Sequence, residues 1–106
     1  MATDRSYLEY ILDQLSDLED ISWRPMMGEY VIYYQGKVIG DICDNRFLLK
    51  PTPTVCAVRA EAPLEAPYSG AKAMVLVDPD EREKLTQSIR LMFGELPFRK
   101  KTPKKR

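Results

Sequence analysis

Apolar side chains recur at helical spacing in the first part of the chain. After Ser6 they return every three or four positions, at Tyr7, Leu8, Ile11, Leu12, Leu15 and Leu18. Such spacing is typical of an amphipathic helix with one face against a core. Ser6 and Glu9 have the spacing of a capping box, so we expect the helix to begin there and to end near Asp20.

A further helix is predicted near the C-terminus. Asp78-Pro79 offers a cap followed by proline at the first helical position, and Glu81 is expected to close the capping box. Gly94 is the expected stop. The apolar side chains between them again follow helical spacing, at Leu85, Ile89, Met92 and Phe93.

Between these helices the pattern changes to short runs rich in β-branched and aromatic residues, which favour strands. Gln35-Gly36 and Asp44-Asn45 are two-residue links suited to tight hairpin turns. Pro25 lacks a backbone N–H, so the strand that contains Trp23 is expected to be short or at a sheet edge. The predicted strands of this antiparallel meander are 21–26, 29–34, 37–43 and 46–50.

Proline marks the end of the meander. Thr52 and Pro53 predict the cap and first position of a short helix. Residues 60–73 show little periodicity and predict a loop, and 74–77 predict one more strand. The order of elements predicts an α+β fold, in which helices flank an antiparallel sheet of about five strands.

The length of 106 residues suits one domain, which we expect to span 1–97. No apolar run is long enough to cross a bilayer, and the N-terminus has no basic segment that leads into an apolar one. We therefore expect a cytoplasmic protein that does not bind membranes.

The formal net charge of zero hides an asymmetry between the two parts of the chain. Taking the six basic residues of the end from the 16 in the chain leaves 10, against 16 acids. We expect 98–106 to be a disordered tail. One hypothesis is that the tail neutralises nucleic-acid phosphates in a salt-sensitive, sequence-independent way. The alternative is a tail that keeps the protein soluble or folds back on the acidic domain. Its candidate phosphate-binding residues are Arg99, Lys100, Lys101, Lys104, Lys105 and Arg106.

The sequence contains no histidine, which removes the commonest general base and the commonest metal ligand. Its two cysteines, Cys43 and Cys56, form neither a disulfide framework nor a metal motif, and we expect both to be small buried side chains. No cofactor and no catalytic residue is predicted.

Two groups of residues resemble catalytic patterns without meeting their requirements. Glu29, Asp41 and Asp44 are candidates for a carboxylate cluster, but Asp44 suits a turn and Asp41 suits solvent. The stretch 69–72 resembles a phosphate loop, but it lacks the first glycine and the hydroxyl residue after Lys72. Neither group predicts an enzyme.

Aromatic residues are frequent in the predicted sheet. A sheet that stacks RNA bases carries lysine and arginine around its aromatic rings, and few are present here. We therefore expect core positions or a protein-binding face for Tyr30, Tyr33, Tyr34 and Phe47.

Several motifs, in this order, resemble the TfoX/Sxy N-terminal domain family. They are Met27-Gly28-Glu29-Tyr30, then Tyr33-Tyr34-Gln35-Gly36-Lys37-Val38, then the run from Cys43-Asp44-Asn45-Arg46 to Leu49-Lys50-Pro51-Thr52. The stretch 66–72 and the lysine-rich end after Leu96-Pro97 resemble short, single-domain members. The family often has phenylalanine where this chain has Met27.

The resemblance implies an α-β(3)-α-β(2)-α arrangement, akin to secretion-chaperone-like and YjbR-like folds. It also implies a bacterial, non-enzymatic protein. The namesake proteins carry a second, C-terminal domain and regulate competence for DNA uptake, by helping a cyclic-AMP receptor protein act in transcription. The implied partner is therefore a protein, and the chain is expected to be a monomer or a homodimer.

Gly28, Glu29 and Tyr30 are the candidate partner-binding residues. A structural role competes with this hypothesis. Glycine permits a sharp entry into a strand, and Glu29 is able to bind the backbone or an arginine such as Arg24 or Arg46.

Overall fold

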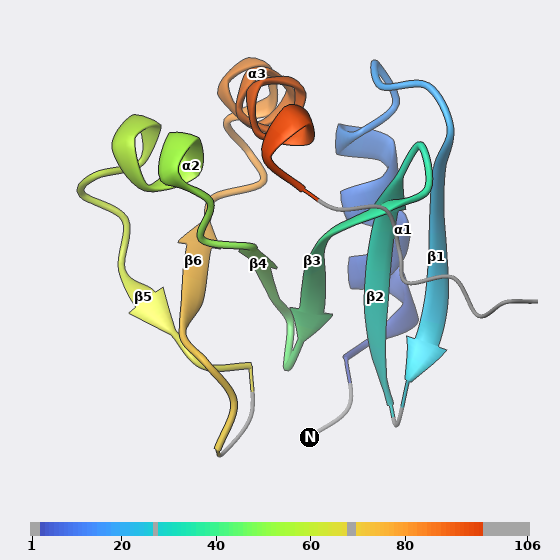
Figure 1. Cartoon of the computed structure of the whole chain (residues 1–106). Helices are drawn as coiled ribbons and strands as arrows, with labels where there is room; N and C mark the ends of the chain where they lie inside the picture. Colours follow the sequence, from blue (N-terminus) through green and yellow to red (C-terminus); the bar gives the residue numbers. More distant parts are fainter. Residues whose placement is uncertain (1–2, 27, 68–69, 97–106) are drawn as a thin grey trace, which may run out of the picture.

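The computed structural model describes residues 3–26, 28–67 and 70–96. Figure 1 shows a single antiparallel sheet with helices packed against it. The elements follow the order α-β(4)-α-β(2)-α, with a short 3-10 helix at the end: α1 (Arg5–Gln14), β1 (Ile21–Met26), β2 (Glu29–Tyr34), β3 (Lys37–Cys43), β4 (Arg46–Leu49), α2 (Pro53–Val58), β5 (Leu64–Glu65), β6 (Met74–Val77), α3 (Arg82–Met92) and η1 (Phe93–Glu95).

The predicted α+β fold is confirmed, with six strands in place of about five. The strand order is β1-β2-β3-β4-β6-β5, and every neighbouring pair is antiparallel. The four-strand group before α2 replaces the three strands that the family resemblance implied, because Ile21–Met26 pairs with β2 along its whole length.

Both predicted two-residue turns are present. Gln35 and Gly36 have φ angles of 50° and 85°, and Asp44 and Asn45 have 53° and 57°. Two consecutive residues with positive φ match the twist of the flanking strands, which explains why these short links close hairpins. Pro25 lies in β1 at the edge of the sheet, as predicted.

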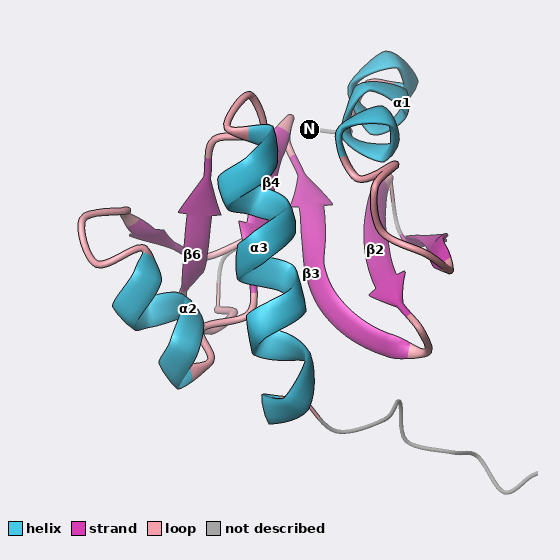
Figure 2. Cartoon of the chain, turned by 90° about the horizontal axis from the view of Figure 1, so that it is seen from above, coloured by secondary structure: helices cyan, strands magenta, loops and turns pink. Residues whose placement is uncertain are grey.

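One sheet face carries the main core. Because successive strand residues point to opposite faces, alternate positions of β2, β3, β4 and β6 face the helices. In the view from above, α3 lies between α1 and α2 (Figure 2). The buried sheet residues of this core are Ile32, Tyr34, Ile39, Ile42, Phe47, Leu49, Val75 and Val77, and the helices contribute Leu8, Ile11, Val55, Leu85, Ile89 and Met92.

The opposite face is only partly buried. Cys43, Leu48 and Met74 form a second, smaller buried cluster, with Leu76 packed against it. Arg46 lies beside this cluster and bonds to Glu65 Oε1 at 2.6 Å and to the carbonyls of Ala66 and Pro67.

Strand β3 contains a bulge next to β2 and a close backbone contact with β4. The register with β2 shifts so that Ile39 is the extra residue, between Val38 and Gly40. A Cβ at Gly40 would lie 2.1 Å from the carbonyl oxygen of Leu48. Only glycine fits this position without moving β3 away from β4.

The predicted boundaries of two helices are wrong. Helix α1 starts at Arg5 with Asp4 as its cap, and neither Asp4 nor Ser6 makes a side-chain capping bond. The α-helix stops at Gln14 and not near Asp20, because residues 15–20 turn the chain into β1 while Leu15 and Leu18 stay buried. Asp20 has a φ of 61°, and its carbonyl accepts the N–H of Gln35.

Helix α3 likewise starts later than predicted. The Asp78 carboxylate accepts the N–H of Asp80 at 2.9 Å, which forms a local turn, and the helix cap is Glu81. At the other end, α3 stops at Met92, before Gly94, and Gly94 lies inside the 3-10 helix η1 that follows.

The cap of α2, the chain at 60–73 and the two cysteines were also predicted from the sequence. The cap of α2 is confirmed, since Thr52 Oγ1 accepts the N–H of Val55 at 3.2 Å. The predicted loop at 60–73 contains β5, because Leu64 and Glu65 pair with β6. Cys43 is buried as expected, but Cys56 is exposed, because it lies on the outer side of α2.

Within the described residues, no helix has the length and apolar character needed to span a membrane.

We expect Gly40→Ala to lower the free energy of unfolding by about 3 kcal/mol or more, because the new methyl group meets backbone and not a movable side chain. Urea unfolding followed by circular dichroism measures this change. Gly94→Ala is the matched control, since a Cβ there has nothing within 4 Å. Equal stability of the two variants would contradict the close approach.

Candidate functional site

Glu29 joins three separate segments of the chain. Its Oε1 atom accepts the Thr3 hydroxyl at 2.8 Å and the N–H of Asp44 at 3.0 Å. Thr3 also donates its N–H to the carbonyl of Gly28, and its hydroxyl accepts the N–H of Asn45. Glu29 therefore fastens the N-terminal segment to the β1–β2 and β3–β4 turns.

Neither of the two arginines expected to pair with Glu29 is bonded to it in the described contacts. Arg46 pairs with Glu65, and the described hydrogen bonds of Glu29 do not include Arg24. Gly28 has a φ of 86°, the conformation that glycine adopts most readily. These contacts give Gly28 and Glu29 a structural role in the fold. Their role in binding a partner stays a prediction.

Tyr30 points to the helix-covered side of the sheet. Its ring meets the Trp23 ring edge to face, with centroids 5.4 Å apart. The Arg5 guanidinium lies 4.9 Å from the centroid of the Trp23 ring. Tyr30 and Trp23 thus close the margin of the core between α1 and β1. Because successive strand residues point to opposite faces, Glu29 and Tyr30 lie on opposite faces of the sheet.

The charges of three carboxylates act on the Cys43 thiol. Burial, and then the charges of Glu29 and Asp41, raise the pKa of Cys43 to about 11. Burial also raises the pKa of Asp41, and the charge of Lys50 partly opposes this. The thiol stays protonated at neutral pH, which makes it a poor nucleophile and a poor metal ligand.

The carboxylates do not form a metal site in the part of the chain that the structure describes. Asp44 serves the β3–β4 turn through its positive φ, and its N–H is bound by Glu29. Glu29, Asp41 and Asp44 are therefore near Cys43 without converging on one space.

The stretch that resembles a phosphate loop leads into strand β6. Gly70 has a φ of 89°, and a Cβ there would meet nothing within 4 Å. Lys72 is exposed, and Ser69 lies outside the described residues. None of Glu29, Asp41 and Lys72 lines the groove along α3, the pocket between α2 and α3 or the pocket beside Tyr33.

The open sheet face is the part of β1, β2 and β3 that faces away from the helices. Register places Arg24 beside Val31, Val31 beside Asp41, and Tyr33 beside Val38. Val31, Tyr33 and Val38 are half-buried, and Met26 is 45% exposed. A shallow pocket of about 270 Å³ lies at one end, lined by Ser22, Trp23, Arg24, Tyr33 and Gly36.

The aromatic residues of the sheet divide between its two faces. Tyr34 and Phe47 are buried in the main core, and Tyr30 lies at its margin. Of the four aromatic residues considered, Tyr33 belongs to the open sheet face.

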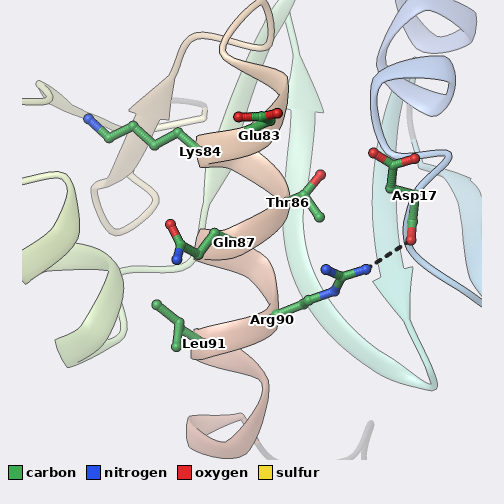
Figure 3. Close-up of a pocket in the computed structure, with 7 residues that line it drawn as sticks. All are labelled: Asp17, Glu83, Lys84, Thr86, Gln87, Arg90 and Leu91. Carbon is green, nitrogen blue, oxygen red and sulfur yellow. Dashed lines mark hydrogen bonds between the residues drawn. The ribbon is translucent and has the colours of Figure 1, made fainter.

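A broad groove of about 950 Å³ runs along α3 beside the segment that follows α1 (Figure 3). Arg90 Nη2 donates to the carbonyl of Asp17 at 3.0 Å, and Arg82 Nη2 donates to Ser16 Oγ at 2.6 Å. Thr86 points from α3 toward this segment, and its buried hydroxyl has no partner among the described residues. Leu91 is 51% exposed. These arginines hold the chain after α1 against α3.

A buried arginine connects α2 with α3. The Arg59 side chain is 4% exposed, and its Nη1 donates to Glu81 Oε1 at 2.8 Å. Its Nε donates to Ser88 Oγ at 3.4 Å. Sequence reasoning missed Arg59 and the α3 groove, because both depend on segments that only the tertiary structure brings together.

The candidate nucleic-acid-binding residues Arg99, Lys100, Lys101, Lys104, Lys105 and Arg106 lie outside the described residues.

Comparison with known proteins identifies the family. A model of the TfoX N-terminal domain matches residues 13–91. The chain belongs to the TfoX N-terminal domain family. The matched range includes β1–β6 and nearly all of α3, so it covers the open sheet face of this TfoX-type domain.

A curated relative is described as an uncharacterized 12.7 kDa protein in the trpE 5′ region of Spirochaeta aurantia. It is 36% identical over 99 residues, which cover 92% of this chain and 86% of that protein. No solved structure matches the chain. The family assignment confirms the resemblance seen in the sequence.

We expect Glu29→Ala to lower the free energy of unfolding by about 1–2 kcal/mol, because Thr3 and the N–H of Asp44 lose an acceptor. Chemical denaturation measures the change, and amide shifts at residues 3, 44 and 45 locate it. Glu9→Ala, which removes an exposed pair with Arg5, is the control and should change stability by less than about 0.5 kcal/mol. A Glu29 variant as stable as the control would exclude the fastening role.

We expect Asp41→Asn to stabilise the protein at neutral pH. Since burial raises the folded-state pKa of Asp41, its charged form costs stability at every pH above that value. The gain should shrink as the pH falls through the folded-state pKa and vanish below 3.8, where both states bind the proton. Unfolding curves at several pH values test this against Asp13→Asn on the exposed side of α1, and a gain that persists in acid would contradict it.

Proposed function

We propose that this TfoX-type protein is a non-enzymatic module that regulates transcription by binding a protein partner through its open sheet face. The observation that carries the proposal is the one-sided cover of the sheet. All three helices pack on one face, while β1, β2 and β3 present apolar side chains on the other.

The surface chemistry supports a protein partner. Val31, Tyr33 and Val38 form a contiguous half-buried strip, and Met26 extends it toward the β1–β2 turn. Contiguous exposed apolar surface with a polar rim is characteristic of protein interaction sites. Arg24 and Asp41 flank the strip and provide polar contacts at its rim.

The chemistry of the candidate catalytic groups supports a non-enzymatic role. The Glu29 carboxylate already accepts two hydrogen bonds, and the Cys43 thiol is held protonated. The sequence supplies no histidine to activate a nucleophile. These observations favour binding over catalysis.

The partner that the TfoX resemblance favours is a cyclic-AMP receptor protein, encountered in the bacterial cytoplasm during the control of competence. In this proposal the partner covers the open sheet face, and Gly28 and Glu29 hold the turn at its edge. The protein acts as a monomer or a homodimer.

The test uses the full chain and the cyclic-AMP receptor protein of the same organism, with calorimetry as the measurement. Val31→Asp and Met26→Asp should each weaken binding by about tenfold or more, because each places a charge in an apolar contact. Leu91→Asp is the matched control, since Leu91 is similarly exposed on α3. Circular dichroism verifies folding, and equal binding by all three variants or none by the unaltered chain would refute the proposal.

A second candidate function is weak nucleic-acid binding through the basic tail, supported by its six positive charges and no acid. Deleting 98–106 should abolish a gel shift whose affinity falls with salt at a logarithmic slope of about −5, for six phosphate contacts. The control is the open-face variant Val31→Asp, which should keep the shift. Absence of any shift by the full chain at low salt would exclude this function.

A further inference from the structure

Arg24 differs from the other arginines that the structure describes. Each of the other five forms a hydrogen bond or an ion pair, namely Arg5, Arg46, Arg59, Arg82 and Arg90. Arg24 is exposed on β1 and forms neither with any described residue. Its guanidinium donors are therefore accessible to a group from outside the described chain.

The acids that share the open sheet face with Arg24 are engaged or distant. Glu29 already accepts two hydrogen bonds. Asp41 lies in the same row as Arg24, but Val31 stands between them, so their backbones are two strand spacings or about 10 Å apart. Among the described residues, none supplies a carboxylate to Arg24.

Arg24 lines the pocket beside Tyr33, whose volume is about 270 Å³. None of the described residues that line this pocket is acidic, whereas acids line both the groove along α3 and the pocket between α2 and α3. Ser22 adds a hydroxyl that makes no hydrogen bond to a described residue. A guanidinium group and a hydroxyl without a neighbouring acid favour an anionic oxygen.

The pocket beside Tyr33 is continuous with the apolar strip of the open sheet face. Strand β1 is at the edge of the sheet, so no further strand of the sheet lies beyond it (Figure 1). Tyr33 belongs both to the pocket and to the strip that it forms with Val31 and Val38. The volume is below the range for small-molecule sites and suits one side chain. An anion held here therefore lies beside apolar surface, as an acidic side chain within an apolar segment does.

We propose that the protein partner of the open sheet face presents an acidic side chain to Arg24, flanked by apolar residues that cover the strip. Its carboxylate accepts hydrogen bonds from the Arg24 guanidinium and the Ser22 hydroxyl, while the neighbouring apolar side chains contact Tyr33 and Val31. A free anion would fill the pocket alone and leave the strip exposed. This inference rests on the proposed function, because it names the chemistry of the partner segment.

Selection from a displayed library of random heptapeptides tests the proposal on the full chain, attached through its C-terminus. Peptides that also bind Arg24→Gln are removed, which discards those held by the basic end that both chains share. The remaining peptides should carry aspartate or glutamate beside apolar residues. No remaining peptide, or remaining peptides without an acid, would overturn the proposal.

Calorimetry with one remaining peptide then measures the pairing, with circular dichroism to verify that each variant folds. Replacing the acid of the peptide by its amide should weaken binding by about tenfold or more, because a charge-assisted hydrogen bond is lost. Arg24→Glu should instead prefer the peptide in which lysine replaces the acid. Equal binding of the acid and amide forms, or a preference of Arg24→Glu for the acidic form, would contradict the pairing.

Two controls exclude general charge attraction. Arg82→Gln removes the same charge from α3 and does not line the pocket, so it should bind the acidic peptide as the unaltered chain does. Acetate at the concentration of the peptide should leave binding unchanged. A loss of about tenfold in Arg82→Gln, or displacement of the peptide by acetate, would overturn the proposal.

A separate titration with the cyclic-AMP receptor protein distinguishes this inference from the proposed function. If that protein does not bind and the acidic peptides do, the Arg24 site stands and the named partner is wrong. If that protein binds in a way that Val31→Asp weakens and Arg24→Gln does not, the proposed function stands and this inference is wrong.

Discussion

The structure depends on burying one face of a six-stranded sheet beneath three helices. Phe47 and Leu49 of β4 lie on that face, and they share one buried core with Leu85 and Ile89 of α3. Full burial of each such side chain contributes about 2 kcal/mol, so this contact supplies the main driving force for folding. Polar contacts also hold the chain near helix ends against the rest of the fold. Lys37 is an example, because its Nζ donates to the carbonyl of Phe93 at 3.0 Å and lies 4.0 Å from that ring.

Two polar junctions, one at Arg46 and one at Glu29, hold chain segments in place beside the sheet. Arg46 holds the chain after β5 beside the smaller buried cluster, and Glu29, at the same end of the sheet, holds the N-terminal segment against the β3–β4 turn. Both junctions leave the centre of the open sheet face uncovered. The fold therefore combines a helix-covered side with a strand surface that carries half-buried apolar side chains, and the proposed binding function uses this surface.

Local chemistry allowed much of this fold to be predicted. The turns at Gln35-Gly36 and Asp44-Asn45 depend only on residues that accept positive φ, so their strands were assigned correctly. The family was also recognisable, because its motifs lie in these strands and turns. Helix ends were harder, since Asp78 bonds within its own turn and the chain after Gln14 must reverse into β1. The pairing of Glu29 with Thr3, and the position of Arg59, depend on contacts between distant segments that no local pattern encodes.

The contacts of Thr3 have a practical consequence for handling the protein. Thr3 is 6% exposed, and its backbone and hydroxyl join two hairpin tips. An affinity tag fused at the N-terminus would be attached two residues from this junction, where the Thr3 N–H binds the Gly28 carbonyl of the β1–β2 turn. A load applied through that end would thus act directly on the contacts that join the two turns, so surface-capture measurements should attach the molecule elsewhere.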